Sequence, residues 1–523
     1  MFLLSNTIHF KSKLLIRYYS PKQRTQEKMV LDITLLRNKD SIEKVKESHA
    51  KRYGVLEDIS DIVSADEQVR KLSYERNNYS KLENLIKKVI GEKNKALGKK
   101  KRQDKLETEE KEQTKVDQTE DDSLVPDEIL QAVPNVDQSA LEKLTHSQLI
   151  KVSMYCKTKR EEISDLCAEN EEIRTMTLKR LGNILHDTVP VGPNDDSNIT
   201  VRVTTVSTDL NVAGKAYLRP EKLLPHYELV KLIDGVDAKA GSKIAGNRGY
   251  FLKGPLVFLG QAVQQLALHI LDDAGFTAIQ TPFFMNEDMM ASVAQLSQFD
   301  EELYKVVCTG SEEDSSNTTK YLIATSEQPL TALHSGERIS EKKLPIKYAG
   351  VSTCFRKEAG RHGKDTSGIF RVHQFEKIEQ FIICSSEKDE CWEHLENMLT
   401  NATKFLDAIN IPYRVVNIAS GELNLAAAKK YDIEGFFPGS NAYRELVSCS
   451  NCTDYHSRNL GIKHTSKTDQ DGRYVHMLNA TMCAVTRMIC VILENYQTVN
   501  GIVVPECLRK YMPSRYSEII PFV

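Results

Sequence analysis

Two long stretches of helical periodicity, separated by a highly charged segment, constrain the N-terminal third of this chain. The second stretch begins near Ser139 and ends near Ile184. In the first, which begins at Asp66, apolar residues recur at three- and four-residue steps: Val69, Leu72, Tyr79, Leu82, Ile86, Val89 and Leu97. Two such helices joined by a polar connection predict an antiparallel coiled-coil hairpin. A first helix of roughly 36 residues would be ~54 Å long.

The residues of this hairpin alone do not decide its role. A coiled coil that joins two copies of a chain is the commoner case, and an arm that grips RNA is the sharper alternative. The basic cluster Lys99–Arg102 alone favours neither, because charge runs are usually solvated surface, and the charged segment Gln103–Asp122 that follows it has no apolar periodicity. Ahead of the hairpin, Met29 to about Ala65 is predicted to form a small helical lead-in.

The overall composition is typical of a water-soluble protein with two or more domains. The chain has 523 residues, 40% of them hydrophobic, and no apolar run approaches the ~18 residues of a membrane-spanning helix. We therefore predict no membrane partner. The net charge of −3 means that any RNA contact depends on local basic patches. Eleven cysteines without a regular framework indicate reduced thiols in an intracellular compartment.

The first 28 residues differ from the rest of the chain. Met1–Lys28 is basic and partly apolar, and its only acid is Glu27. Such segments are typical of organelle transit peptides, and Arg17–Ser20 looks like a mitochondrial processing site. Met29 offers a second start. The alternative is an extension with no targeting role.

After about Asp187 the pattern changes to short β-rich runs with amphipathic helices between them. Helices are predicted at Leu259–Ala274 and Cys391–Ile409, and strands at Thr200–Ser207, Leu256–Phe258, Tyr321–Ala324, Lys347–Cys354, Gln374–Cys384 and Tyr413–Asn417. This order predicts an α+β domain on an antiparallel sheet. No strand–GxGxxG–helix unit is present, so a Rossmann site is not supported.

The segment Gly350–Phe381 carries the chemistry of a nucleotide site. It is predicted to form two strands joined by a polar loop, with Arg356 and Glu358 on the first arm and Phe375 and Glu379 on the second. The planar fork of an arginine suits a phosphate. A glutamate can accept from the adenine amino group, and an aromatic ring can stack on the base. These residues could hold ATP without a Walker loop.

This hairpin closely resembles motif 2 of class II aminoacyl-tRNA synthetases, in the form found in seryl-tRNA synthetases of the eukaryotic cytosolic type. Gly275–Phe284 resembles motif 1, which forms the homodimer interface in that family, and Met477–Arg487 resembles motif 3. The resemblance extends from about Met29 to Pro513, with the three motifs in family order behind the coiled-coil arm. In the family such an arm reaches the long variable arm of the tRNA.

The resemblance also implies roles for individual residues. Catalytic roles fall to Arg356, Glu358 and Arg487. Serine would be bound by Thr325, Glu327, Arg356, Glu379 and Asn479. ATP would be bound by Arg356, Lys357, Glu358, Val372, His373, Gln374, Phe375, Glu445, Leu446, Val447, Ser448 and Arg487. Glu445 and Ser448 supply the hard oxygen atoms that suit Mg²⁺ on the ATP phosphates.

Zinc is not expected from the sequence. Cys449 and Cys452 form a CxxC, which could be half of a structural zinc site. Such a site needs a second ligand pair, the chain has no other CxxC, and His456 alone does not complete the set.

The sequence thus predicts a class II synthetase that activates L-serine with ATP and charges tRNA(Ser), and tRNA(Sec) where the organism has one. Predicted domains are an N-terminal extension or transit peptide at 1–28, a tRNA-binding helical domain at 29–187 with its arm at about 66–184, and a catalytic domain at 188–523. A homodimer in the cytoplasm is expected, and also mitochondrial location if translation starts at Met1. Alternatives are an inactive paralogue, a structural coiled-coil protein, or an adenylate-forming enzyme for another amino acid or a carrier protein.

Overall fold

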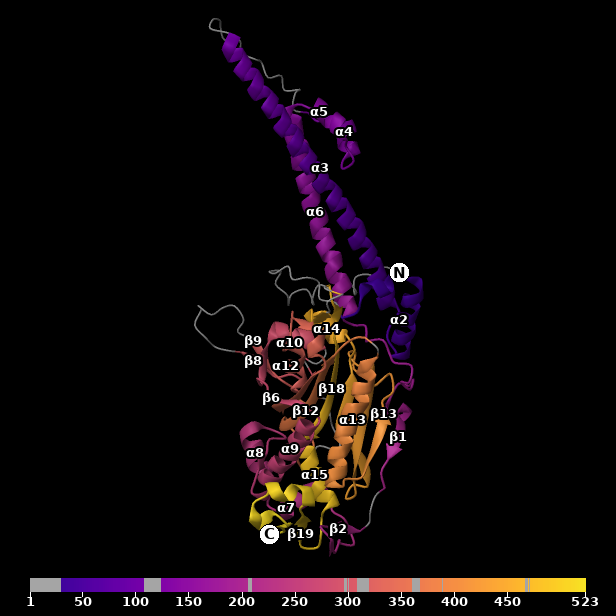
Figure 1. Cartoon of the computed structure of the whole chain (residues 1–523), viewed down its shortest axis with the longest axis vertical. Coiled ribbons are helices and arrows are strands. Elements are labelled where there is room, and N and C mark those ends of the chain that lie inside the picture. The colour runs from indigo at the N-terminus through magenta and orange to yellow at the C-terminus, as the bar shows by residue number, and fades with distance from the viewer. Residues whose placement is uncertain are drawn as a thin grey trace.

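A long helical arm projects from a body built on one large sheet (Figure 1). The computed structural model describes residues 30–107, 124–205, 209–295, 299, 301–307, 319–359, 367–387, 389–465, 469 and 471–523, with side chains omitted at 96–107. The extension Met1–Lys28 and most of the charged segment Gln103–Asp122 therefore lie outside the described residues. Among the described residues, no helix is long and apolar enough to cross a membrane.

The predicted coiled-coil hairpin is confirmed, with corrected boundaries. The lead-in contains α2 (Lys39–Lys51), and the arm consists of α3 (Glu57–Glu107), α4 (Asp127–Ala132), α5 (Gln138–Lys143) and α6 (His146–Leu178). Contacts of Glu83 with Arg160 and of Ser73 with Cys167 show that α3 and α6 run antiparallel. Their buried core contains Leu82, Ile86, Val89, Leu149, Val152 and Cys156.

Three features of the arm differ from the prediction. The first helix begins at Glu57, not at Asp66. The second periodic run is two helices, because the Thr145 hydroxyl accepts from the Gln148 backbone and the Gln148 side chain accepts in return, a capping box that starts α6 anew. Helix α6 ends at Leu178, so Ile184 lies beyond it.

The base of the arm is fastened to the body by side-chain contacts to backbone carbonyls. Asn183 Nδ2 donates to the carbonyls of Ala426 and Cys452, both at 2.8 Å. From the lead-in, Arg52 Nη2 donates to Ala427 O at 2.5 Å. These bonds join the arm to loops that flank strands of the central sheet.

The central sheet has eight strands and is antiparallel except for its last pair. Its order is β1 (Ile199–Val203), β13 (Tyr413–Asn417), β14 (Lys429–Phe437), β15 (Ala442–Asn451), β18 (His476–Ala484), β12 (Gln374–Cys384), β11 (Ile346–Phe355) and β6 (Thr277–Gln280). Within this sheet, only β11 and β6 pair in parallel. The predicted α+β class on an antiparallel sheet is confirmed.

Smaller elements surround this sheet. The short sheets pair β2 (Leu210–Val212) with β3 (Lys215–Tyr217), β4 (Val236–Asp237) with β5 (Phe251–Leu252), β19 (Gly501–Val503) with β20 (Ile519–Pro521), β7 (Phe284–Asn286) and β8 (Lys305–Val307) with β9 (Thr319–Leu322), and β10 (Arg338–Ser340) and β17 (Arg473–Tyr474) with β16 (Lys463–Thr465). The short helices are α7 (His226–Leu232), α8 (Ala238–Ala245), α10 (Glu287–Val293), α12 (Glu327–Ala332) and α14 (Tyr455–Leu460).

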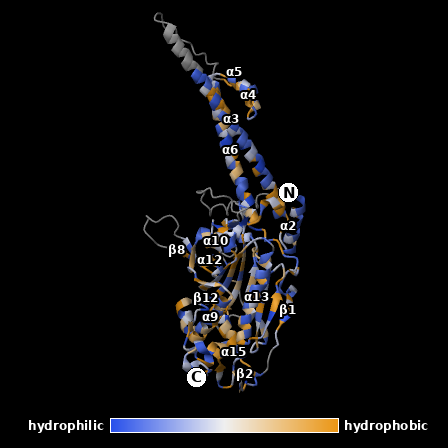
Figure 2. Cartoon of the chain, viewed as in Figure 1, coloured by the Kyte–Doolittle hydropathy of each residue, from blue (hydrophilic) through white to orange (hydrophobic). Residues whose placement is uncertain are grey.

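Three helices, α9 (Pro255–Asp273), α13 (Glu390–Ile409) and α15 (Val485–Asn495), pack against the sheet and share its main apolar core (Figure 2). The predicted strand Leu256–Phe258 is wrong, because these residues are in the first turn of α9. Pro255 starts that helix directly after Gly254, whose φ is +52°. A run of three apolar residues is too short for its periodicity to separate strand from helix.

The other face of the sheet carries charged side chains of β12. On β12, Gln380 Nε2 donates to Met398 O of α13, which places this side chain on the helix-covered face. Because side chains alternate along a strand, Phe375, Lys377 and Glu379 point to the opposite face. The candidate site is built on that face.

Candidate active site

The hairpin that carries the predicted phosphate ligand consists of β11 and β12. Phe355 pairs with Gln374 at the end of the ladder. Arg356 and Glu358 therefore follow β11 and do not lie on it, which corrects the sequence expectation. The backbone amide of Arg356 still donates to His373 O at 2.9 Å, so the chain stays paired as it leaves the strand. Glu358 has a left-handed φ of +51°, which turns the backbone at the edge of the site.

A β-bulge on each of two strands interrupts the alternation of side chains near the site. On β15, Glu445 pairs with Glu434 and Val447 pairs with Ile433, so Leu446 is an extra residue. This insertion lets Glu445 and Ser448 point to the same face, although their spacing of three would otherwise separate them.

The second bulge lies on β18. There Thr481 pairs with Glu379 and Cys483 pairs with Ile378, which leaves Met482 as the extra residue. Asn479 pairs with Phe381, and cross-strand partners share a face, so Asn479 and Thr481 join Glu379 on the site face.

At one end of the site lies a cluster of two acids, the buried Glu379 and the half-buried Glu327. Asn479 Nδ2 donates to Glu327 Oε1 at 2.9 Å. Glu379, which is 1% exposed, forms an ion pair with Lys377. Lys377 Nζ also donates to Thr325 Oγ1 at 3.1 Å. The Glu327 backbone amide donates to Thr325 Oγ1 at 3.2 Å, so four of the residues predicted to bind serine, Thr325, Glu327, Glu379 and Asn479, form one connected group.

Burial disfavours the charged forms of both acids in this cluster. It raises the pKa of Glu327 to about 7, with a further contribution from the charge of Glu379. Burial also raises the pKa of Glu379, although Lys377 opposes that shift. The positive charges of Lys377 and Arg356 lower the pKa of both acids but do not outweigh burial, so a ligand with an ammonium group would be favoured here.

At the other end a cavity is lined by Arg356, Glu358, Phe370, Arg371, Val372, Phe375, Lys377, Glu445, Leu446, Thr481, Ala484, Thr486 and Arg487. The Arg356 guanidinium lies 5.6 Å from the centre of the Phe375 ring, and its Nε donates to Ala324 O at 3.2 Å. The Arg487 guanidinium lies 4.9 Å from the centre of the Phe370 ring. Two arginines and two aromatic rings in one cavity suit a phosphorylated nucleotide.

Charge pairing also organises this end. Arg487 Nη1 lies 3.4 Å from Glu445 Oε2, and Arg371 Nη1 lies 3.3 Å from Glu358 Oε2. Partial desolvation raises the pKa of Glu445, but the charges of Arg487 and Lys430 outweigh it and hold that pKa well below its ordinary value. Glu445 is therefore ionised at neutral pH.

Three of the remaining predicted ATP residues, Lys357, His373 and Gln374, do not line this cavity, and Val447 is buried in the main apolar core. His373 and Gln374 line a neighbouring cavity with Tyr250 and Tyr304. Lys357 donates its backbone amide to Glu302 O at 2.9 Å.

Comparisons with known proteins decide the family. Residues 30–136 match the model for the seryl-tRNA synthetase N-terminal domain, and residues 304–496 match the class II tRNA synthetase core domain (G, H, P, S and T). The cytoplasmic serine–tRNA ligase of Macaca fascicularis is 47% identical over 504 residues, which cover 95% of this chain and 92% of the relative. The human cytoplasmic enzyme is 46% identical with the same coverage. The chain belongs to the seryl-tRNA synthetase family.

Solved structures of seryl-tRNA synthetases agree in fold. The cytoplasmic enzyme of Naegleria fowleri, solved with AMP, has a TM-score of 0.76 and 40% identity and covers 94% of this chain and 99% of its own. The enzyme of Pyrococcus horikoshii, solved with ATP, has the same TM-score, 32% identity, and coverage of 94% and 100%.

Sequence reasoning missed several residues of this synthetase site. Lys377 could have been found, because it lies between Phe375 and Glu379 in the period-two pattern of one strand. Thr481 could have been found in the same way, because it lies two residues after Asn479 on one strand. Asp432 could not, because its place on the site face depends on its partner strand. Asp432 is the cross-strand partner of Ser448, and Lys430 Nζ lies 3.4 Å from Asp432 Oδ2.

The donor set on β14 and β15 fits a magnesium ion. Glu445 and Ser448 present a carboxylate and a hydroxyl on one face, and hard oxygen donors are what Mg²⁺ prefers. Asp432 adds a third oxygen, because its buried Oδ1 accepts no hydrogen bond from the described residues. The residues therefore suit the metal that class II synthetases use with ATP.

Proposed function

We propose that this chain activates L-serine with ATP and transfers the seryl group to tRNA(Ser). The observation that carries the proposal is the single polar face on which the acid cluster of Glu327 and Glu379 meets the cavity of Arg356 and Arg487. An amino acid with its ammonium group at the acids would present its carboxylate toward the arginines. This is the arrangement that adenylate formation requires.

The first step joins a serine carboxylate oxygen to the α-phosphorus of ATP and breaks the bond to the β-phosphate. Arg356 contacts the serine carboxylate and the α-phosphate and stabilises charge that develops during attack. Arg487 pairs with the γ-phosphate. Glu358 accepts from the adenine amino group, and Phe375 stacks on the base. Positioning and charge neutralisation supply most of the rate enhancement, so no strong base is needed.

Glu445 and Ser448 would hold Mg²⁺, and Asp432 lies beside them. The ion when bound supplies positive charge to the phosphate oxygens. In the chain itself, the lowered pKa of Glu445 keeps this carboxylate ionised and ready to act as a ligand.

Serine is selected by its hydroxyl group. Glu379 and Asn479 hydrogen-bond the substrate, so alanine would leave buried polar groups unpaired, which costs far more than a lost methylene. Threonine is excluded by its additional methyl group. In the second step the terminal ribose hydroxyl of the tRNA attacks the seryl carbonyl carbon, and AMP leaves.

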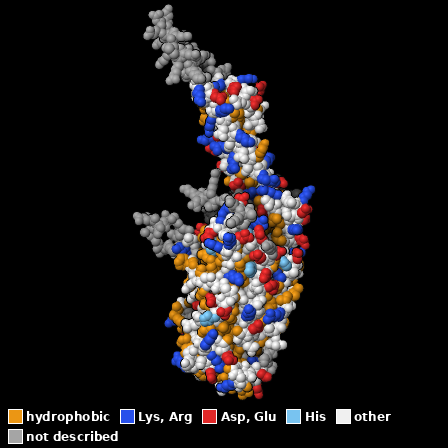
Figure 3. Space-filling view, viewed as in Figure 1, with side chains coloured by type: hydrophobic (Ala, Val, Ile, Leu, Met, Phe, Trp, Pro, Cys, Tyr) orange, Lys and Arg blue, Asp and Glu red, His pale blue; other side chains and the backbone are white. Residues whose placement is uncertain are grey.

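The arm binds the tRNA, in our proposal, and the working enzyme is a homodimer. Basic side chains are spread along the visible face of the arm with acidic ones between them (Figure 3). Exposed lysines on α3 and α6 include Lys81, Lys87, Lys88 and Lys157. Strand β6, within the motif 1 segment, is the end strand of the sheet, where a second copy could pack. Charging of tRNA(Sec), cytoplasmic location and a mitochondrial form translated from Met1 complete the proposal.

The deciding experiment is ATP–pyrophosphate exchange by the purified chain with serine, alanine, threonine and cysteine in parallel. Exchange with serine alone is the expected result. Exchange with another amino acid would replace serine as substrate, and exchange with none would favour an inactive paralogue. Charging of tRNA(Ser) transcripts then tests the second step.

A further inference from the structure

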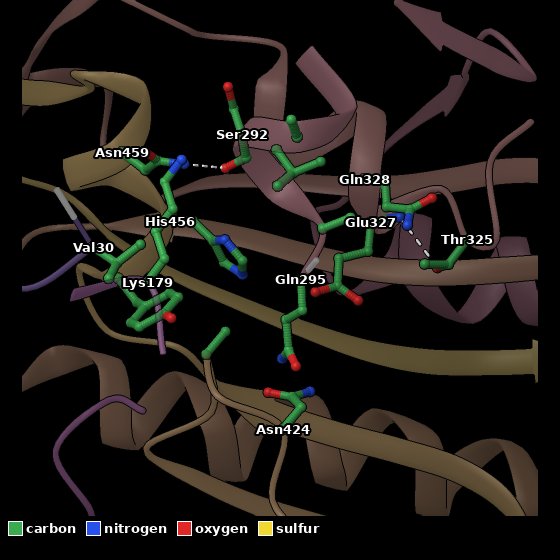
Figure 4. A pocket seen from close by; sticks show the side chains of 15 residues that line it. Val30, Lys179, Ser292, Gln295, Thr325, Glu327, Gln328, Asn424, His456 and Asn459 are labelled. Atoms are coloured by element: carbon green, nitrogen blue, oxygen red, sulfur yellow. Dashed lines mark hydrogen bonds between the residues drawn. The ribbon is translucent and has the colours of Figure 1, made fainter. Parts of the chain in front are cut away.

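A second cavity lies next to the serine end of the site, where the arm meets the body. It is lined by Thr325, Glu327 and Gln328 from the catalytic core, by His456 and Asn459 of α14, and by Val30 and Lys179 from the N-terminal region (Figure 4). Figure 4 shows the His456 ring and the Glu327 carboxylate reaching into this cavity from different elements. The proposed reaction gives no role to His456.

Three potential metal ligands converge here. One atom each from Glu327, Cys452 and His456 lies within 4.8 Å of the other two. Glu327 is the first residue of α12, Cys452 follows β15, and His456 is in α14. Distant parts of the chain thus supply a carboxylate, a thiol and an imidazole to one small volume.

This grouping differs from the half-site considered from the sequence. Cys449 is buried in the main core, and its Sγ lies 3.8 Å from Leu395 O of α13. The CxxC motif therefore does not act as a pair. Cys452 instead takes its partners from His456, four residues on, and from Glu327, which no spacing rule connects to it.

The local contacts leave His456 available as a ligand. It is 8% exposed, and among the described residues it has a ring contact with Tyr455 but no hydrogen bond or ion pair. Asn479 Nδ2 donates to Glu327 Oε1 at 2.9 Å and lies 3.7 Å from Cys452 Sγ, so it orients two of the three groups. A buried imidazole without a partner, aimed into a cavity, is an observation independent of the cluster itself.

We propose that Glu327, Cys452 and His456 form a binding site for Zn²⁺ or a divalent transition metal of similar ligand preference. Sulfur and nitrogen donors select such ions over Mg²⁺, and three protein ligands leave one position open to the cavity. Ligands of a tetrahedral zinc lie roughly 3.3–3.8 Å apart, so the side chains need to close by about 1 Å. Metal binding releases the Cys452 thiol proton to solvent.

The site would make zinc an inhibitor that competes with serine. This consequence rests on the proposed function, in which the Glu327 carboxylate receives the serine ammonium group. The same carboxylate cannot serve both ligands, so metal and amino acid exclude each other. ATP binding, which uses the arginine cavity, would be unaffected.

The first test measures metal binding directly and needs no catalysis. The full chain, stripped of metal by a chelator, is titrated with Co²⁺ and observed by absorption spectroscopy. We expect a thiolate-to-cobalt charge-transfer band that Zn²⁺ abolishes. Cys452→Ser should lose the band, His456→Gln should weaken Co²⁺ binding at least tenfold, and Cys449→Ser should retain both. Absence of the band, or its loss only in Cys449→Ser, would overturn the site.

The second test separates this inference from the proposed function. At a free Zn²⁺ concentration buffered to nine times its Kd, the KM for serine in pyrophosphate exchange should rise about tenfold. In His456→Gln the rise should be less than twofold, and the KM for ATP should not change in either protein. An equal rise in both proteins would refute the competition. No exchange with serine would defeat the proposed function while the cobalt spectrum still decides the metal site.

Discussion

The base of the arm and the catalytic face both bury acidic side chains, but they balance the charge differently. Asp66 of α3 is 2% exposed and accepts from Arg37 at 2.8 Å and from Arg174 at 2.9 Å, with Arg70 at 3.2 Å. Burial raises the pKa of Asp66, but these arginines outweigh it and lower that pKa. This acid is fully compensated by cations of the chain itself.

The acids of the catalytic face are under-compensated. Burial raises the pKa of Glu327 and Glu379, and the charges of Lys377 and Arg356 do not outweigh it. A buried acid that is paired with cations of the chain stabilises the junction between the arm and the body. A pair of acids whose burial is not offset in this way favours the binding of a further cation, which a substrate can supply. The Asp66 cluster therefore has the charge balance of a structural ion cluster, and the Glu327 and Glu379 pair has that of a binding site.

The largest effect is expected from removing positive charge on the catalytic side. Arg356→Ala should reduce the rate of serine-dependent pyrophosphate exchange by on the order of 10³-fold, because the charge that develops at the α-phosphate loses its partner. Binding of tRNA, measured by filter retention, should stay within twofold of the parent. Retained exchange would show that Arg356 does not contact the phosphate.

On the arm side, removing a cation should cost stability. Arg174→Met leaves the buried Asp66 with one fewer partner and should lower the free energy of unfolding by about 3 kcal/mol. The matched control is Lys159→Met, which breaks an exposed pair with Glu162 and should lower the free energy of unfolding far less. Urea unfolding followed by helical circular dichroism measures both, and equal losses would remove the distinction between the two clusters.

The arm should also be separable from the chemistry. The contact of Ser73 with Cys167 marks a level above the Asp66 cluster, so replacing residues 74–166 with a short glycine linker keeps the base intact. Pyrophosphate exchange should remain within about twofold. The kcat/KM for tRNA charging should fall at least about 100-fold, which corresponds to roughly 2.8 kcal/mol of lost binding energy. Unimpaired charging would show that the arm does not hold the tRNA.

The two regions also differ in what their sequences reveal. The arm could be predicted because the apolar core residues recur at regular steps within α3 and within α6, so each helix can be recognised from its own sequence. The errors in the predicted helix boundaries are also local, because Thr145 is a capping residue inside a periodic run that looks continuous. On the catalytic side, the residues of one strand, Phe375 and Glu379, were placed correctly by alternation.

What could not be predicted there depends on partner strands. Leu446 and Met482 are recognisable as bulge residues only when the register of β14 and β12 is known. The proximity of Glu327 to Cys452 and His456 arises from the packing of α12 and α14, which no spacing in the sequence encodes. A search for paired CxxC motifs therefore does not find the cluster of Glu327, Cys452 and His456.

The charge comparison can be sharpened by pH, with a smaller effect. Because the pKa of Glu327 is raised to about 7, the ionised form that receives the serine ammonium group is lost as the pH falls below that value. The KM for serine should then rise about tenfold per pH unit below 7, while the KM for ATP should change little.

The same shift has a signature in stability. The folded chain binds an extra proton at Glu327 between its ordinary pKa of 4.5 and about 7, so this residue's contribution to the free energy of unfolding declines as the pH rises through that window. Glu327→Gln should remove the pH dependence from both the KM for serine and this part of the stability curve. Identical pH profiles in the parent and Glu327→Gln would mean that another group takes up the proton. Glu379 would be the next residue to replace, because its pKa is raised in the same cluster.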